Sequence, residues 1–289
     1  WLGALAWAAA YLAYPAMSQL NLNFSYGWHP VTCALPLIFG VLWALSRRRY
    51  FPALCLAIVA CSFKETVFVF FACLSSALCL VAWMNRGRLD RDRKDPISRA
   101  FTPVQWLAVV LGFVAAGVTV SLFFSRAAGF QTSRLFGELG AGWWEILSSP
   151  LTNPTVFWPR VANSDSMYFI LALAIPMGAA ALWHGRWVLL AVVPPLGVLL
   201  IWNHAAATSI NFQYSTTLIP TLVVAALTGA FYAGGKGGTS VRAMRSHGMA
   251  ALAAALTAST FVGALPWSRP TIPFAPQYDH TRIRLREMK

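Results

Sequence analysis

Long apolar segments dominate this chain and constrain its fold more than any other feature. A helix needs about 20 apolar residues to cross a bilayer core of about 30 Å. Hydrophobic residues make up 58% of the 289 residues and charged residues 11%, whereas about a quarter of a soluble domain is charged. We therefore predict an all-α, polytopic integral membrane protein with about nine transmembrane helices. The segments are residues 1–20, 31–46, 51–63, 66–84, 104–124, 167–183, 187–203, 214–233 and 249–266.

Lys64 and Glu65 interrupt the apolar stretch between residues 51 and 84. As one helix this stretch would be about 51 Å long at about 1.5 Å per residue, which exceeds the bilayer core. Two helices joined by a turn fit the bilayer better. The hairpin also returns the arginines at 47–49 to the same side as the basic run at 85–94. We therefore predict a transmembrane hairpin with the Lys-Glu pair at its turn.

The basic residues indicate the orientation of the chain. In this topology the loops near 47–49, 86–99, 186 and 236–245 share one side and hold 13 of the 22 Lys and Arg residues. Cytoplasmic loops carry such an excess, so we expect these basic loops to be cytoplasmic. No basic patch with interleaved aromatic residues is visible, so the sequence does not indicate nucleic-acid binding.

The segments divide the chain into a transmembrane helical domain over 1–266, an outer loop over 125–166 within it, and an extracytoplasmic tail over 267–289. The chain begins without Met, in an apolar segment, and we expect N-terminal spans to be missing and the tail to be truncated. In the outer loop, Trp143, Trp144, Ile146 and Leu147 are typical of a short interfacial helix, which anchors a chain in the outer leaflet.

Several polar side chains fall on the outer side together with Lys64 and Glu65. Ionisable groups at membrane depth are costly and usually face a bundle interior or a wet cavity. The pair is therefore either a solvated turn in which the two side chains bond locally, or part of an outward-facing polar site. His29 is either part of this polar site or a residue packed beside Pro30 at a helix start. Tyr214 is either part of the site or an aromatic residue at the membrane interface. The other candidates are Gln213 and Asp165.

Three stretches carry a resemblance to a known family. "YLAYPAMSQLNLNFSYGWHPVTCALPL", "CLAIVACSFKETVFVFFA" and "INFQYSTTLIPTLVVAALTGA" resemble successive parts of the bacterial membrane family called domain of unknown function 2079. The resemblance covers residues 1–235, and its strongest motifs are His29-Pro30, Lys64-Glu65 and Tyr214-Ser215. That family is similar to the type C glycosyltransferases, membrane enzymes that take sugars from polyprenyl-phosphate carriers at the outer membrane face. The resemblance also implies the bacterial cytoplasmic membrane.

The resemblance implies roles for the candidate residues. Lys64 would pair with the phosphate of the lipid donor, and Glu65 would bind the sugar or help to activate the acceptor hydroxyl. His29, Gln213, Tyr214 and Asp165 would line the substrate site. The main catalytic acid of such enzymes lies in a first outer loop, which is expected upstream of residue 1.

The sequence indicates neither a cofactor nor a metal. The five cysteines form no CxxC pair, and no His or Cys spacing matches a structural zinc site. The expected partners are membrane lipid and a polyprenyl-phosphate sugar. Two other classes remain open, namely a transporter or lipid flippase with the same charges along its pathway, and a non-catalytic membrane subunit.

Overall fold

The structure is a computed structural model, and every regular element among its described residues is a helix. This confirms the predicted all-helical class. The described residues are 2–14, 31–47, 49–84, 103–128, 136–140, 142–178, 182–183, 185–203, 205–208, 210, 213–233 and 240–262.

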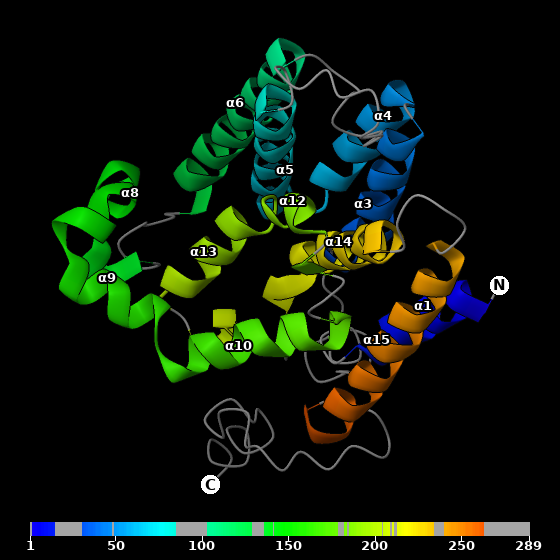
Figure 1. The fold of residues 1–289 in the computed structure, drawn as a ribbon. Coiled ribbons are helices and arrows are strands. Elements are labelled where there is room, and N and C mark those ends of the chain that lie inside the picture. The colour runs from blue at the N-terminus through cyan, green and yellow to red at the C-terminus, as the bar shows by residue number, and fades with distance from the viewer. Residues whose placement is uncertain are drawn as a thin grey trace, which may run out of the picture.

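The α-helices are α1 (Leu2–Ala13), α3 (Val31–Ser46), α4 (Tyr50–Cys61), α5 (Glu65–Met84), α6 (Pro103–Ala128), α8 (Trp143–Thr152), α9 (Pro154–Val161), α10 (Ser164–Ala174), α12 (Arg186–Leu189), α13 (Val193–Ile201), α14 (Leu218–Ala233) and α15 (Ser240–Val262). Short 3-10 helices are η2 (Gly137–Leu139), η3 (Ile175–Met177), η4 (Ala205–Thr208) and η5 (Gln213–Thr217). Figure 1 shows α14 in the middle of the arrangement, with α3 to α6 in one half and α10, α1 and α15 around the other.

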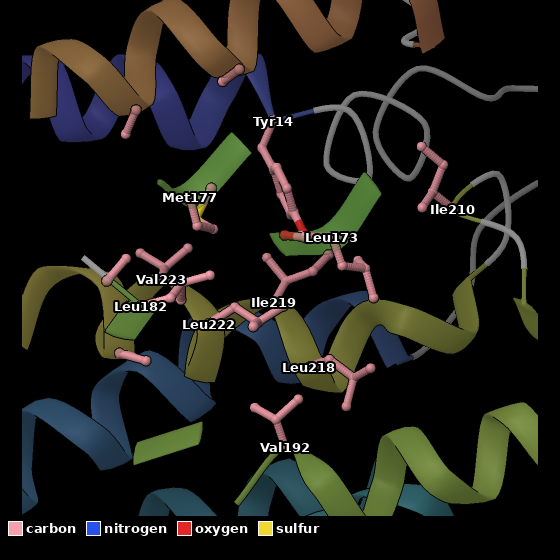
Figure 2. Packing of buried hydrophobic residues seen from close by; sticks show 14 of the residues in the cluster. Tyr14, Leu173, Met177, Leu182, Val192, Ile210, Leu218, Ile219, Leu222 and Val223 are labelled. Atoms are coloured by element: carbon pink, nitrogen blue, oxygen red, sulfur yellow. The ribbon is translucent and has the colours of Figure 1, made fainter. Parts of the chain in front are cut away.

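The largest buried cluster surrounds α14. Leu218, Ile219 and Leu222 of this helix belong to one buried cluster with Leu173 of α10 and Met177 of η3. In Figure 2, Ile219 and Leu222 lie on the side of Leu173, whereas Leu218 points toward Val192. Apolar residues occur on all sides of α14, so it can contact α3, α12, α15 and η3 at the same time. This central helix leads directly out of η5, which places the residues of η5 at the edge of the core.

α1 and α15 pack closely because small residues line their contact. Ala6 and Ala10 of α1 and Ala251 and Ala255 of α15 are all buried. A Cβ added to Gly248 would lie 2.9 Å from Cδ1 of Trp7 and 3.2 Å from the backbone carbonyl oxygen of Gly3, so glycine at this position allows the two helices to approach closely. Small residues at such a contact are typical of helix pairs in membranes.

Hydrogen bonds connect the middle and the C-terminal end of α1 to the rest of the molecule. Trp7 Nε1 donates to the carbonyl of Met244 at 3.2 Å, and Ser259 Oγ donates to the carbonyl of Ala13. Beyond the last residue of α1, the buried Tyr14 hydroxyl donates to the carbonyl of Leu173 at 2.7 Å, as Figure 2 shows. These bonds satisfy polar groups that lie away from water.

Large apolar side chains point outward on several helices. Phe51 and Ile58 of α4 are 77% and 60% exposed, whereas Ala53, Ala57 and Ala60 of the same helix are buried. A helix of a soluble protein shows the opposite pattern. The exposed face of α6 is similar and carries Leu107, Leu111, Val114 and Val118. Such extended apolar surface is typical of a chain that contacts a membrane or a partner.

The helix boundaries match the predicted break at Lys64. α4 ends at Cys61 and α5 begins at Glu65, and the two helices contact each other. α3 packs along α4, and α5 packs along α6, where the rings of Phe71 and Phe113 stack at 5.3 Å. In the predicted outer loop, α8 forms where the sequence predicts a short helix.

The count of nine spans is not confirmed by the described helices. Only one of them contains a stretch, residues 214–231, that is long and apolar enough to cross a membrane. Where one span is predicted over 187–203, the structure has two short helices, α12 and α13, separated by residues 190–192. Pro194 and Pro195 explain this break, because proline lacks the N–H that a continuous helix needs and is tolerated in a first helical turn.

Candidate functional site

The candidate site begins at the turn between α4 and α5. The backbone amides of Ser62 and Phe63 donate to the carbonyls of Val59 and Ala60, which closes the last turn of α4. The Lys64 carbonyl then accepts from the amide of Val67 at 3.0 Å, at the start of α5. Local hydrogen bonds thus satisfy the backbone of the turn and leave the Lys64 side chain to make a tertiary contact.

That contact is a cation–π interaction with Tyr214. Lys64 Nζ lies 5.9 Å from the centroid of the Tyr214 ring, within the range of about 6 Å where the ring attracts a cation. Both side chains are half-buried. Two residues that the sequence singles out separately therefore meet in the structure.

A second aromatic residue extends the contact. The ring of Trp202 meets the ring of Tyr214 edge to face, with centroids 5.0 Å apart and an interplanar angle of 69°. Trp202 directly follows α13 and has extended backbone, with φ −66° and ψ 128°. We call Lys64, Tyr214 and Trp202 the Lys64 cluster. It joins the α4–α5 turn, η5 and the end of α13.

Buried hydroxyl groups continue from Tyr214 into the core. Ser215, Thr216 and Thr217 of η5 and Thr221 in the first turn of α14 are all buried. Among the described residues, Ser215 Oγ and Thr221 Oγ1 have no hydrogen-bond partner. Buried hydroxyls are usually satisfied, so this stretch is unusually polar for a membrane-protein core.

None of the described carboxylates forms an ion pair with Lys64. Asp165 is exposed in the first turn of α10, where a negative charge suits the helix dipole, and it makes no ion pair with a described residue. Glu145 lies at the start of α8, where its Oε2 accepts from the amide of Gly142 at 3.4 Å. The structure thus gives Asp165 no contact with Lys64, and its predicted substrate-binding role stays a prediction.

The remaining candidates are described only in part. Glu65 is the first residue of α5 and Gln213 the first of η5, but their side chains lie outside the description. His29 lies outside the described residues, as do the basic loop at 86–99 and the tail at 267–289. No group of three potential metal-ligating side chains occurs within the described part of the chain.

Sequence reasoning missed Trp202. The polar stretch that begins at Asn203 was the visible signal, and Trp202 is the aromatic residue immediately before it. Because Trp202 directly precedes this polar stretch, it could have been included among the candidate residues. Its contact with Tyr214 joins two segments of the chain, and no local pattern determines that contact.

One comparison with known proteins gives a match. Residues 2–272 match the family described as Predicted membrane protein (DUF2079). No curated protein and no solved structure matches the chain.

Proposed function

The chain belongs to the DUF2079 family of predicted membrane proteins, and from this premise we propose that it is a membrane glycosyltransferase. Its donor is a polyprenyl-phosphate sugar, bound at the outer face of a bacterial cytoplasmic membrane, with the basic loops on the cytoplasmic side. The resemblance to type C glycosyltransferases motivates the reaction. The Lys64 cluster is the observation that carries the proposal.

Lys64 has the properties of a phosphate-binding cation. Its amine is half-buried against Tyr214 and forms no ion pair with a described carboxylate. A cation in such surroundings interacts with an anion more strongly than one in water, because the local dielectric constant is lower. A lipid phosphate at membrane depth is therefore a suitable ligand for this amine.

The aromatic rings of the Lys64 cluster suit a sugar. Trp202 and Tyr214 are both half-buried and meet edge to face. Flat aromatic faces bind the C–H faces of sugar rings, and their polar atoms orient the hydroxyl groups. A phosphate beside Lys64 would hold its attached sugar near these two rings.

The apolar exterior of the neighbouring helices suits the lipid chain of the donor. Phe51 and Ile58 expose their side chains on α4, the helix that leads into the Lys64 turn. An isoprenoid chain can lie along such a surface and lose contact with water. The donor would thus have its chain in lipid and its phosphate at the turn.

Glu65 is the proposed helper carboxylate, because it directly follows Lys64 and begins α5. In the transfer, an acceptor hydroxyl attacks the anomeric carbon and forms a new C–O bond. The bond between that carbon and the phosphate oxygen breaks, and its electron pair leaves with the lipid phosphate. The hydroxyl proton passes to a carboxylate acting as general base.

A transporter or lipid flippase is the second candidate, favoured by the break between α12 and α13. Discontinuous helices often form the binding sites of transporters. The buried hydroxyls of Ser215 and Thr221 lie in η5 and in the first turn of the neighbouring helix α14. In this alternative the same polar groups would line a pathway for the lipid head group.

The test is sugar transfer and donor binding by the purified protein in proteoliposomes. We would measure both with a polyprenyl-phosphate sugar for the wild type, Lys64→Met and Glu65→Gln. We expect Lys64→Met to weaken donor binding by about tenfold or more, and Glu65→Gln to abolish transfer while the protein still inserts.

The matched control is Arg49→Met. Arg49 forms the other cation–π pair of the same helical hairpin, with its Cζ 5.8 Å from the ring centroid of Trp43. We expect its loss to change donor binding less than twofold. Equal loss in both variants, or transfer unchanged by Glu65→Gln, would overturn the assigned roles. Lipid movement across the bilayer without sugar transfer would favour the flippase.

A further inference from the structure

A second cationic group lies close to the Lys64 cluster. Arg160 is in the last turn of α9 and is half-buried. Its Nη1 donates to the carbonyl of Phe136 at 2.7 Å, and the guanidinium makes no other hydrogen bond or ion pair with a described residue. A guanidinium carries five N–H donors, so most of its donors remain available.

The backbone of Arg160 is held in place. Its carbonyl accepts from Asn163 Nδ2 at 2.7 Å and from Ser166 Oγ at 2.9 Å. Asn163 Oδ1 in turn caps α10 by accepting from the amide of Ser166 at 2.8 Å. Because the backbone of Arg160 is already fixed, little conformational freedom of the backbone is lost when its side chain binds a ligand.

Gly137 lies beside the guanidinium and beside a second nitrogen donor. Its φ is +57°, and a Cβ added there would lie 3.4 Å from Arg160 Nη2 and 3.2 Å from Asn203 Nδ2. Two nitrogen donors therefore face the side of Gly137 on which any other residue would carry its Cβ. Asn203 is exposed and makes no hydrogen bond with a described residue, so its amide is accessible to a solute.

A separate small core holds these groups together. Phe136, Leu139, Ile146 and Ile201 are buried against one another, which connects η2 and α8 with α13. Val161, next to Arg160, packs on the same cluster. The arrangement of donors thus rests on packed helices of its own.

We propose that Arg160 and Asn203 bind an oxyanion, a phosphate or a carboxylate, above Gly137. This inference rests on the proposed function in one respect, since the oxyanion would belong to the sugar or acceptor bound at the Lys64 cluster. Asn203 directly follows Trp202, which connects the two sites. The substrate would then carry a second anionic group besides the phosphate at Lys64.

Glu138 opposes this binding. It is exposed next to Gly137 and forms no ion pair with a described residue. Its negative charge repels an anion, and at physiological salt this repulsion is screened fully only beyond about 8 Å. Glu138→Gln should therefore raise the affinity of the Arg160 site for an anion, which gives a variant with the opposite sign of effect.

The test is thermal unfolding of the full chain in detergent, with inorganic phosphate, glucuronate or chloride at matched ionic strength. We expect phosphate, glucuronate or both to raise the Tm of the wild type above the value in chloride. Arg160→Gln and Asn203→Asp should lower the apparent affinity by about tenfold or more. A shift with phosphate alone identifies a phosphate group as the ligand, and a shift with glucuronate alone a carboxylate.

Two glycine variants separate ligand binding from backbone strain. Gly137→Ala would place a methyl group within 3.4 Å of both nitrogen donors, where it would obstruct an anion, and should remove the anion-dependent shift. Gly178→Ala is the matched control, because Gly178 also has positive φ, +84°, but no atom lies within 4 Å of its added Cβ. We expect the control to keep the shift, even where its Tm without ligand is lower.

The proposed oxyanion site is wrong if phosphate and glucuronate do not raise the Tm of the wild type, or if they raise it equally in the wild type and in Asn203→Asp. The exposed Asn203 makes that variant informative even where Arg160→Gln fails to fold. An Arg160-dependent shift without any polyprenyl-phosphate transfer would overturn the proposed function and leave the oxyanion site standing. Transfer that depends on Lys64, without the anion shift, would overturn the oxyanion site alone.

Discussion

Two cation–π pairs lie beyond opposite ends of α4, and they differ in how they are built. Arg49, just before α4, lies with its Cζ 5.8 Å from the ring of Trp43. Lys64, just after α4, lies with its Nζ 5.9 Å from the ring of Tyr214. The distances are nearly equal, but Trp43 belongs to the preceding helix in the sequence, whereas Tyr214 belongs to η5.

Burial also separates the two pairs. Trp43 is 55% exposed and Arg49 is exposed as well, whereas Lys64 and Tyr214 are half-buried and Tyr214 also contacts Trp202. A local, exposed pair helps to end a helix. A long-range, half-buried pair fixes three segments around one cation, which is what a binding site needs.

Removing the aromatic partner should show the largest difference between the pairs. Tyr214→Ala should lower the free energy of unfolding by about 2–3 kcal/mol, since truncating a fully buried aromatic costs about 3–5 kcal/mol. Trp43→Ala should cost about 1 kcal/mol or less. Equilibrium unfolding in mixed detergent micelles measures both values, and equal losses would contradict the distinction.

Gly185→Ala should disturb the packing around the Lys64–Tyr214 pair and not the Arg49–Trp43 pair. A Cβ at this position would overlap the backbone carbonyl oxygen of Ala225 and force α12 away from α14. Overpacking of this kind costs about 1–3 kcal/mol, and α12 also contacts α5. We expect lower stability and weaker donor binding.

The control for this variant is Gly197→Ala in α13. No atom lies within 4 Å of a Cβ at Gly197. Because alanine favours a helix more than glycine does, this variant should gain up to about 1 kcal/mol. A loss of stability in Gly197→Ala, or none in Gly185→Ala, would contradict the packing described.

Removing the cations should have a smaller effect on stability. Lys64→Met should cost about 1 kcal/mol and Arg49→Met about 0.5 kcal/mol, since cation–π contacts strengthen as water is excluded. Raising the salt concentration should weaken the exposed Arg49 pair more than the Lys64 pair. Unfolding at low and high salt measures this difference, and the reverse order would count against the burial of Lys64.

Two serine variants should have the smallest effects, and equal ones. Ser46 Oγ donates to the carbonyl of Trp43, and Ser62 Oγ to the carbonyl of Val59, both at 2.7 Å. Both bonds are local and exposed, so Ser46→Ala and Ser62→Ala should each cost about 0.5 kcal/mol. A much larger loss of stability in Ser62→Ala would mean that the turn between α4 and α5 holds Lys64 in place in addition to its contact with Tyr214.

Much of the fold follows from patterns that are local in the sequence. The apolar composition predicts helices, and the Lys-Glu interruption predicts the break between α4 and α5, because a helix of that total length exceeds a bilayer. The interruption between α12 and α13 was not predicted. Pro194 and Pro195 were visible, but prolines inside membrane helices are often accommodated without a break.

Less of the candidate site follows from the sequence. Lys64 and Tyr214 stand out because a cation and an aromatic residue with a polar tip adjoin apolar segments, but their contact is tertiary. Arg160 carries no distinctive local signal, and the polar stretch that begins at Asn203 does not by itself show that Trp202 meets Tyr214 or that Asn203 lies near Arg160. Asp165 stood out by its charge, yet its exposed place in α10 gives it no described contact with Lys64.

The sequence by itself determined that the chain is helical and apolar and that a turn presents Lys64, because hydropathy and backbone hydrogen bonding act over a few residues. Only the tertiary structure decided that this amine meets Tyr214 and Trp202, and that Arg160 and Asn203 converge above Gly137. Those contacts join segments far apart along the chain. Their geometry depends on the packing of α13 and α14 against α3, α5 and α9, which no single segment encodes.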